Sequence, residues 1–255
     1  MNPTVTFAPI KTGRKSAPFN LGAEVDRSVG AELRDGDILV VSSKFVAVSE
    51  GRIVDLARVV PSDYATSLST SLNMPPELCE LVIRESDEIV GGVSGFMLTL
   101  KEGLLTPNAG IDKSNVEHGK VVLYPRNPFE SASVLVEEMR FRRGVDIGVV
   151  VSDSRLMPTR KGTVGVALAA VGVEAILDLR GKPDLFGNVL KVTSQAIADD
   201  LCSGAQVVMG EANESVPIVL VRGLSTSAGR GYRMSSFAVD PEQCVYMRSL
   251  GYRAR

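Results

Sequence analysis

The sequence predicts a mixed fold of α-helices and β-strands, and three observations favour it. Short runs of β-branched apolar residues at 38–41, 149–151 and 218–221 are typical of buried strands. Longer segments between these runs repeat apolar residues at helical spacing. The chain also lacks the GxxxxGKS or GxxxxGKT spacing of a P-loop, so a P-loop nucleotide-binding core is not expected.

In the first half of the chain, turn residues and helix-start signals separate the predicted elements. Pro75 and Pro76 are placed to begin a helix, because proline fits the first helical turn. The glycine-rich stretch 91–95 is interpreted as a flexible joint. We expect helices over residues 21–33, 62–72, 75–86 and 130–143, the last with an apolar stripe of Val134, Leu135 and Met139, and strands over 5–10, 38–41, 96–100, 103–106 and 121–124.

In the second half, the apolar run at 149–151 predicts a buried strand that ends at Ser152-Asp153-Ser154. Residues 162–172 are rich in glycine, alanine and valine, and their pattern fits a helix or a strand. The stretch 178–187 is a long polar loop. The remaining predicted elements are strands over 190–193 and 218–221 and helices over 195–208 and 241–250.

Size and composition are those of a globular protein and exclude several function classes. The 255 residues suffice for one large or two small domains, with 44% hydrophobic and 23% charged residues. The net charge of −2 argues against nucleic acid as the main partner, because phosphate backbones attract a basic excess. No apolar stretch approaches the roughly 20 residues of a membrane span, and no signal peptide is seen. The sequence therefore predicts a cytoplasmic protein without membrane or nucleic-acid partners.

The cysteines and the single histidine offer little chemistry. Cys79, Cys202 and Cys244 are odd in number and far apart in sequence, which favours free thiols in a reducing compartment over a disulfide or a zinc site. A serine or cysteine hydrolase would have to use His118, which reads as a loop residue with no nucleophile motif nearby.

Carboxylates lie beside apolar runs at three places in the sequence. Asp153 stands between two serines, Asp112 lies in the polar loop 107–115, and Glu211 follows the apolar run 207–209. Carboxylate and hydroxyl oxygens are the ligands that hard divalent cations prefer. Taken singly, Asp153 is also typical of a cap or turn and Asp112 of an Asx-turn. Likewise, Ser43 and Lys44 either cap the element after their strand or contact a nucleotide phosphate.

Several short motifs occur in an order that resembles one enzyme family. Each motif is weak by itself, but their order and spacing together are specific. The motifs are Asp35-Gly36-Asp37, Glu50-Gly51-Arg52, Arg84-Glu85-Ser86, Asn108-Ala109-Gly110-Ile111-Asp112 with Ser114-Asn115-Val116, Ser152-Asp153-Ser154, Asp184-Leu185-Phe186-Gly187 with Val192-Thr193, Met209-Gly210-Glu211 and Val221-Arg222-Gly223. From about residue 7 to residue 224, the chain is similar to the gamma-glutamyl ligases of the deazaflavin coenzyme F420.

The resemblance implies a fold class, a domain organisation and a reaction. The fold would be mixed α+β with two intertwined lobes, neither P-loop nor Rossmann, in a homodimer. Residues 1–224 would form the catalytic region, with a lobe boundary near 91–95, and residues 225–255 a C-terminal tail. GTP would phosphorylate the terminal carboxylate of the deazaflavin precursor, and the amine of L-glutamate would displace phosphate from that acyl phosphate, with further rounds adding gamma linkages. Two divalent cations per site, Mn²⁺ or Mg²⁺, would hold the phosphates, and K⁺ is a further candidate ion.

The resemblance also implies roles for individual residues. Asp112 and Asp153 resemble the ligands of one metal, and Ser154 and Glu211 those of the second. Asp112, Asp153 and Arg160 are the implied catalytic residues. The implied nucleotide contacts are Pro9, Ile10, Lys11, Thr12, Ser43, Lys44, Asn115, Met209, Gly210, Glu211, Ala212 and Asn213, with the second loop extending to Val216.

The sequence departs from the family pattern around the expected metal site. Val48 stands where the family usually has a nucleotide-contacting lysine, and Asn127 where an aspartate is frequent. The loop 155–159 lacks the usual arginine and tryptophan, although Pro158 and Arg160 remain. Two alternatives therefore stay open: a related metal-dependent ligase with another acceptor or nucleotide, and a non-catalytic binding protein that keeps the fold.

Overall fold

The computed structural model describes residues 4–227 and 229–253, which form two compact units. Unit 1 comprises Met1–Gly13, Leu21–Ser42 and Phe129–Tyr232. Unit 2 comprises Arg14–Asn20, Ser43–Pro128 and Arg233–Arg255. The chain is a mixture of helices and sheets, so the predicted α+β class is confirmed.

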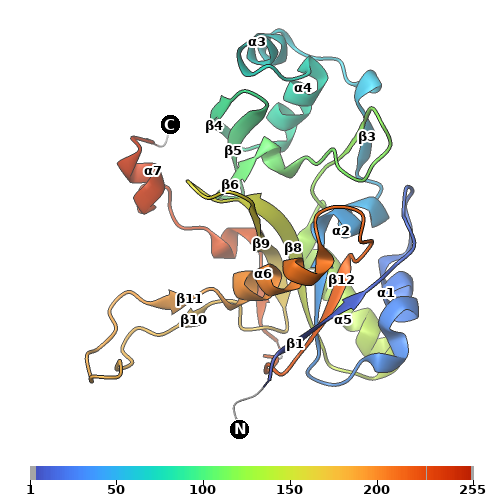
Figure 1. Cartoon of the computed structure of the whole chain (residues 1–255), viewed down its shortest axis with the longest axis vertical. Coiled ribbons are helices and arrows are strands. Elements are labelled where there is room, and N and C mark those ends of the chain that lie inside the picture. The colour runs from blue at the N-terminus through green and yellow to red at the C-terminus, as the bar shows by residue number, and fades with distance from the viewer. Residues whose placement is uncertain (1–3, 228, 254–255) are drawn as a thin grey trace. The chain divides into compact units, whose positions relative to one another are not determined.

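Unit 1 is built on a six-stranded sheet in the order β1-β12-β2-β8-β9-β13 (Figure 1). Only β2 and β8 are parallel, with Ser42 opposite Ser152, and the other neighbours are antiparallel. The apolar runs found in the sequence form the middle of this sheet, where Val40, Val150 and Val219 are fully buried. The strands are β1 (Thr6–Ile10), β2 (Ile38–Ser42), β8 (Gly148–Leu156), β9 (Thr163–Val171), β12 (Ile218–Arg222) and β13 (Gly231–Tyr232).

Helix α6 (Ile197–Met209) packs against this sheet and contacts β9 most extensively. A side chain at Gly165 would lie 2.3 Å from the backbone of Cys202, so glycine is required for this close approach of helix and strand. The other helical segments of this part of the chain are α1 (Leu21–Val29), η1 (Gly30–Glu32) and α5 (Pro128–Arg143). A two-stranded arm of β10 (Leu177–Asp178) and β11 (Ser194–Gln195) completes unit 1.

Unit 2 contains two small sheets and short helices. One sheet pairs β3 (Ile53–Asp55) with β7 (Lys120–Val122), and the other joins β4 (Glu88–Val93), β5 (Phe96–Lys101) and β6 (Leu104–Pro107). Its helical segments are α2 (Ser43–Ser49), η2 (Leu56–Arg58), α3 (Asp63–Leu72), α4 (Pro76–Glu85), η3 (Asn108–Gly110), η4 (Met234–Phe237) and α7 (Val245–Ser249).

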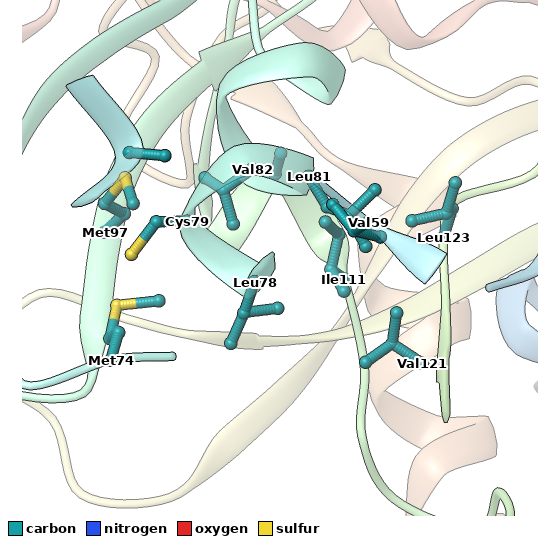
Figure 2. Packing of buried hydrophobic residues seen from close by; sticks show 12 residues of the cluster. Val59, Met74, Leu78, Cys79, Leu81, Val82, Met97, Ile111, Val121 and Leu123 are labelled. Atoms are coloured by element: carbon teal, nitrogen blue, oxygen red, sulfur yellow. The ribbon is translucent and has the colours of Figure 1, made fainter. Parts of the chain in front are cut away.

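The core of unit 2 gathers around α4 (Figure 2). Leu78, Cys79 and Val82 present its apolar stripe to Met97 on β5 and to Ile111. The spacing of 78, 79 and 82 is that of one helical face, which explains why the sequence pattern predicted this helix. The same cluster includes Val121 and Leu123, so the segment around β7 is held by the same apolar contacts as the helices.

Most predicted elements are confirmed, but the strand expected to end in Ser152-Asp153-Ser154 is longer. Strand β8 continues to Leu156, because β9 pairs with it as far as Thr163. Asp153 and Ser154 therefore lie within a strand and not at its end. The undecided segment 162–172 is that partner strand.

Two other predictions were wrong: the strand at 190–193 and the flexible joint at 91–95. Residues 190–193 form no strand, and Val192 is 86% exposed, so this apolar run has no surface to pack against. The stretch 91–95, expected as a flexible joint and lobe boundary, lies inside unit 2, where it completes β4 and turns into β5. The chain instead passes between the units at other points, including 42/43 and 128/129.

Two helices differ in detail from the prediction. Helix α7 covers only Val245–Ser249 of the expected 241–250. In α5, Val134 is 47% exposed and does not belong to the buried stripe. The buried positions are Ala132, Leu135, Val136 and Met139, which follow the i, i+3, i+4, i+7 spacing of one helix face.

The cysteines are free thiols, and the described helices are too short or too polar to span a membrane. Cys79 and Cys202 are buried free thiols and Cys244 is partly exposed, as the sequence indicated. Burial raises the pKa of Cys202 well above its ordinary value, so this thiol stays protonated. Within the described residues, no helix has the length and apolar character needed to cross a membrane.

Candidate functional site

Asp112 is presented by an unusual backbone turn in unit 2. Three consecutive residues, Asn108, Ala109 and Gly110, have positive φ angles of 50°, 51° and 77°. Such angles are costly for Asn108 and Ala109, and the structure supports them from β5. The Asn108 side chain accepts a hydrogen bond from Met97 N at 2.8 Å, and Ala109 N donates to the buried Thr99 hydroxyl at 3.2 Å.

The backbone of Asp112 is then fixed by an isolated bridge to Val122. Asp112 N donates to Val122 O, and Val122 N donates to Asp112 O, both at 2.9 Å. Next to this bridge, a side chain at Gly110 would lie 2.1 Å from the ring of Tyr124, so only glycine fits there. Strain and close packing together hold Asp112 in one place, which is the behaviour expected of a functional loop.

The carboxylate of Asp112 is oriented by Ser114 and Lys44. Ser114 N donates to Oδ1 at 2.6 Å, which is the Asx-turn that the sequence left open. Lys44 Nζ lies 2.6 Å from Oδ2 and also donates to the Ser114 hydroxyl at 2.7 Å and the Ser114 carbonyl at 3.0 Å. Burial raises the pKa of Asp112, but the charge and hydrogen bonds of Lys44 and Ser114 outweigh it, so the net pKa lies below its usual range. The group is therefore an anion that already has a cation beside it.

Asp153 and Ser154 lie in unit 1, on the antiparallel pair of β8 and β9. A β-bulge follows Val151, and beyond it Asp153 pairs with Val166 and Ser154 with Gly165. A bulge shifts the register and redirects the side chains that follow it. Asp153 is half-buried and Ser154 is exposed, while Ser152 before them is buried.

Glu211 lies just beyond α6 in unit 1. Gly210 ends that helix with a φ of 72°, and the exposed Glu211 carboxylate accepts a hydrogen bond from Gln206 in the last helical turn. The same glutamine donates to the Thr163 hydroxyl at 3.1 Å. Sequence reasoning missed Gln206 and Thr163, because they are 43 positions apart in the chain and neither belongs to a motif on which the family resemblance rests.

Two predicted nucleotide loops of unit 1 lie side by side. Strand β1 pairs with β12, which places Ile10 opposite Ile218. Beyond the strands, Thr12 N donates to Ser215 O at 3.1 Å and Ser215 Oγ donates to Thr12 O at 2.9 Å. The segment Pro9, Ile10, Lys11 and Thr12 is thus joined to the loop that follows α6, which begins after Met209 and contains Gly210, Glu211, Ala212 and Asn213.

The predicted site residues are divided between the two units. Unit 1 carries the two joined loops, Asp153, Ser154 and the exposed Arg160, which follows β8. Unit 2 carries Asp112 with Ser43, Lys44 and Asn115. Asn115 is exposed, with a positive φ of 54°, and Ser43 is buried at the start of α2.

The chemistry of these residues fits hard divalent cations. Each predicted ligand offers carboxylate or hydroxyl oxygen, and Asp112 already attracts an ammonium group. Within residues 4–227 and 229–253, no three His, Cys, Asp or Glu side chains form a complete metal cage. The predicted set does not require one, since Mg²⁺ usually binds through one or two carboxylates together with substrate phosphates and water.

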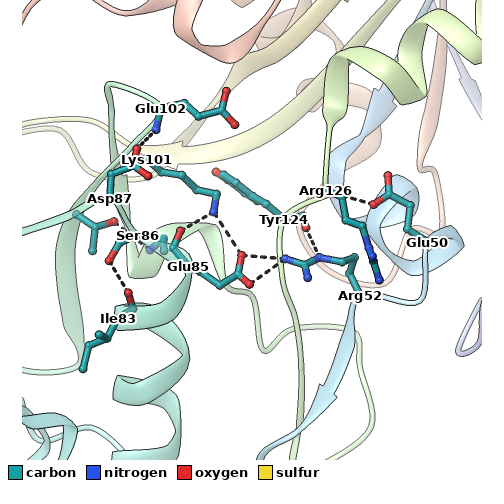
Figure 3. Close-up of polar contacts among 12 residues, drawn as sticks. Glu50, Arg52, Ile83, Glu85, Ser86, Asp87, Lys101, Glu102, Tyr124 and Arg126 are labelled. Carbon is teal, nitrogen blue, oxygen red and sulfur yellow. Dashed lines mark hydrogen bonds and ion pairs between the residues drawn. The ribbon is translucent and has the colours of Figure 1, made fainter. Parts of the chain in front are cut away.

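The motifs Glu50-Gly51-Arg52 and Arg84-Glu85-Ser86 meet in unit 2 (Figure 3). Arg52 Nη2 donates to both oxygens of the Glu85 carboxylate, to Oε1 at 2.9 Å and to Oε2 at 2.8 Å. Lys101 Nζ lies 3.3 Å from Oε2 of the same carboxylate. Arg52 Nε also donates to Tyr124 O at 2.9 Å. Because the ring of Tyr124 packs against Gly110, this ion-pair network supports the loop that presents Asp112.

Two further motifs meet in unit 1. Arg222 contacts both oxygens of the buried Asp37, at 2.7 and 3.0 Å. The hydrogen bonds and charge of Asp37 raise the pKa of Arg222. These motif residues hold β12 and β2 together and do not themselves form a site.

A comparison with protein-family models identifies the chain. The model of the F420-0:gamma-glutamyl ligases matches residues 10–223. The chain belongs to this family. Its members include coenzyme F420:L-glutamate ligases from Methanopyrus kandleri, 38% identical over 229 residues that span 89% of this chain and 90% of the relative, and from Methanocaldococcus jannaschii, 40% identical over 78% of this chain and 80% of the relative. The ligase of Archaeoglobus fulgidus is 36% identical over 83% of this chain and 84% of its own.

Proposed function

We propose that this chain is a ligase that joins L-glutamate to the precursor of the deazaflavin coenzyme F420. The support is family membership over nearly the whole chain, shared with relatives named for that reaction. The strained loop that holds Asp112 as a pre-oriented anion is the structural observation that carries the proposal, because catalytic groups need such support.

For the mechanism, we propose GTP as the phosphoryl donor and an acyl phosphate as the intermediate. The γ-phosphoryl group passes to a carboxylate oxygen of the precursor, and GDP leaves. The glutamate amine then attacks the acyl carbon, the amide bond forms, phosphate departs and the amine loses a proton to solvent. Phosphoryl transfer of this kind asks the protein mainly for positioning and for neutralisation of phosphate charge.

The charged and hydroxyl-bearing residues of the predicted site have defined tasks in this proposal. Asp112, Asp153, Ser154 and Glu211 offer oxygen ligands for Mn²⁺ or Mg²⁺, which would neutralise the phosphates when bound. Lys44 and Arg160 supply positive charge from the protein itself, and Lys11 stands in the loop joined to Ser215. K⁺ stays a further candidate ion of the same proposal.

Mass spectrometry of the reaction tests the proposal directly. Purified protein is incubated with the deazaflavin precursor, L-glutamate, Mn²⁺ and GTP, with ATP in a parallel reaction. We expect mass increments of glutamate in the GTP reaction alone, and their number gives the length of the tail. Folded, metal-loaded protein that yields no increment with any nucleotide, and releases no phosphate, would identify a non-catalytic member of the family.

A second candidate function is a related ligase with another nucleotide or acceptor. Val48, at the position where the family usually has a lysine, is 5% exposed and packs with Ala47 and Val122 in an apolar cluster. A charge at this position is absent, so nucleotide recognition must rely on other residues. Turnover with ATP or with another acceptor, but not with GTP and the deazaflavin, would favour this candidate.

We propose in addition that the protein works as a homodimer, as the family resemblance implies. The arm between β10 and β11 supports association, because its apolar side chains have no packing partner within the described chain. Leu185 is 100%, Phe186 91% and Val192 86% exposed. A second copy of this chain is the occupant that we propose for that surface.

A further inference from the structure

Three polar side chains of unit 1 form a short hydrogen-bonded series that ends at Glu211. Thr163 is the first residue of β9, and Gln206 lies in the last turn of α6, which packs on that strand. The side-chain amide of Gln206 donates to Thr163 Oγ1 at 3.1 Å and to a carboxylate oxygen of Glu211. Both N–H groups of one amide are therefore engaged, one by each neighbour.

The neighbours of Gln206 determine which way its amide faces. An ionised carboxylate only accepts hydrogen bonds, so the NH₂ group and not the carbonyl oxygen must face Glu211. This orientation leaves Gln206 Oε1 buried without a hydrogen-bond partner among the described residues. An unsatisfied buried acceptor lowers stability. The arrangement therefore favours the contact to Glu211 over the stability of the fold, which indicates a functional use for that contact.

We propose that Gln206 is a positioning residue that holds the Glu211 carboxylate in one orientation, and that Thr163 fixes Gln206 in turn. Glu211 is exposed and follows a glycine, so its side chain would otherwise sample many rotamers. A hydrogen bond from a rigid helix removes that freedom before a cation arrives. The inference rests on the proposed function, because it takes Glu211 as an oxygen ligand for a divalent cation.

Mn²⁺ binding to the protein tests the inference without turnover, and it is measured by the loss of the free-ion signal in electron paramagnetic resonance. Gln206→Leu removes both hydrogen bonds at similar side-chain size. Thr163→Val removes only the anchor and leaves the Gln206 amide in place. We expect Gln206→Leu to weaken Mn²⁺ binding about tenfold or more, the usual effect of losing a partner of a metal ligand, and Thr163→Val to weaken it less.

The other end of α6 offers a matched control. Gln195 donates to Asp200 at 3.0 Å, which is also a glutamine–carboxylate contact across five residues, but Asp200 is not a predicted ligand. Gln195→Leu should leave Mn²⁺ affinity within about twofold of the wild type. A combined Gln206→Leu, Glu211→Gln variant should bind Mn²⁺ no more weakly than Glu211→Gln alone, because the positioning effect acts only through Glu211.

The outcomes separate this inference from the proposed function. If Glu211→Gln weakens binding but Gln206→Leu and Thr163→Val behave like the control, the positioning role is wrong and the ligand assignment stands. If Glu211→Gln binds Mn²⁺ like the wild type, or the wild type binds none, Glu211 is not a cation ligand and this inference is wrong, whereas the proposed ligation is tested separately by glutamate addition in mass spectrometry. Circular dichroism of each variant identifies loss of fold. If Gln206→Leu does not fold, the Mn²⁺ affinity of Thr163→Val, the milder change, tests the positioning role.

Discussion

At the scale of single residues, charge and hydrogen bonding decide what each carboxylate can do. Asp112 and Glu80 both lie in unit 2 and both have a lowered pKa, but for different reasons. Asp112 stands beside Lys44, on the surface of a strained loop. Glu80 lies on α4 and accepts hydrogen bonds that fix the start of α3. The first arrangement is suited to binding a cation and the second to stabilising the fold.

We predict that Asp153→Asn keeps the fold but abolishes ligation, because an amide oxygen lacks the charge that retains a divalent ion. Glutamate addition by mass spectrometry and Mn²⁺ affinity measure the effect. Asp184→Asn is the control, since Asp184 lies in the same unit and accepts backbone hydrogen bonds that asparagine can also accept. Full activity of Asp153→Asn would show that the assigned ligand is wrong.

We predict that Glu80 makes stability depend on pH in the acidic range. Hydrogen bonds from the Ser62 hydroxyl and backbone N–H, and from Arg84, lower the pKa of Glu80 to about 2. The folded state therefore prefers the ionised form, and this stabilisation is complete above the ordinary glutamate pKa and lost as pH falls towards 2. The melting temperature of the wild type should exceed that of Glu80→Gln at pH 6, and the difference should shrink by pH 3. An equal difference at both pH values would contradict the prediction.

At the scale of elements, the loop before β7 shows how backbone strain and packing cooperate. Its three positive φ angles are sustained by contacts from β5, and its glycine accommodates the Tyr124 ring. Arg52 donates to the carbonyl of Tyr124 and pairs with Glu85, which links this loop to the end of α4. Contacts from β5, from the Tyr124 ring and, through Arg52, from the end of α4 therefore position this loop, all within unit 2.

We predict that Gly110→Ala destabilises the protein and displaces Asp112. The new methyl group would lie 2.1 Å from the Tyr124 ring, and φ is +77°. The backbone strain costs about 1–2 kcal/mol, and overpacking adds about 1–3 kcal/mol. Gly119→Ala is the control, because φ is +82° there but no atom lies within 4 Å, so only the backbone cost applies. Urea denaturation compares the two variants, and equal losses would mean that the Tyr124 contact is unimportant.

At the scale of the whole molecule, the chain forms two units, each with its own buried core. The arm of unit 1 is an exception to the usual burial of apolar residues, since Leu185 and Phe186 lie on its surface. Exposed apolar side chains on an extended arm favour association with another protein surface. The exposed apolar side chains of the arm are therefore the surface through which we expect the dimer to form.

We predict that light scattering gives a mass of about twice the 27.2 kDa of one chain. Phe186→Ser should weaken the dimer and leave the melting temperature of the isolated chain little changed, because the side chain is 91% exposed. Val60→Ser, at 79% exposure in unit 2, is the control for loss of a surface apolar group. A monomeric wild type would contradict the proposed assembly.

Elements whose pattern is local could be predicted from the amino-acid sequence. The buried runs at 38–41 and 218–221 and helix α4 with its proline start follow from spacing and side-chain type. The same is true of the motif order that indicates the family. These features depend on neighbours a few residues away, which the linear sequence contains.

Features that depend on partners far away in the sequence became visible only in the folded protein. Strand β8 extends past Asp153 because β9 pairs with it, and 190–193 fails to form a strand because Val192 finds no surface to cover. The contact of Gln206 with Thr163 joins residues 43 positions apart. Hydrogen-bond pairing and burial are properties of surfaces brought together by folding, so no local pattern of apolar or polar residues can specify them.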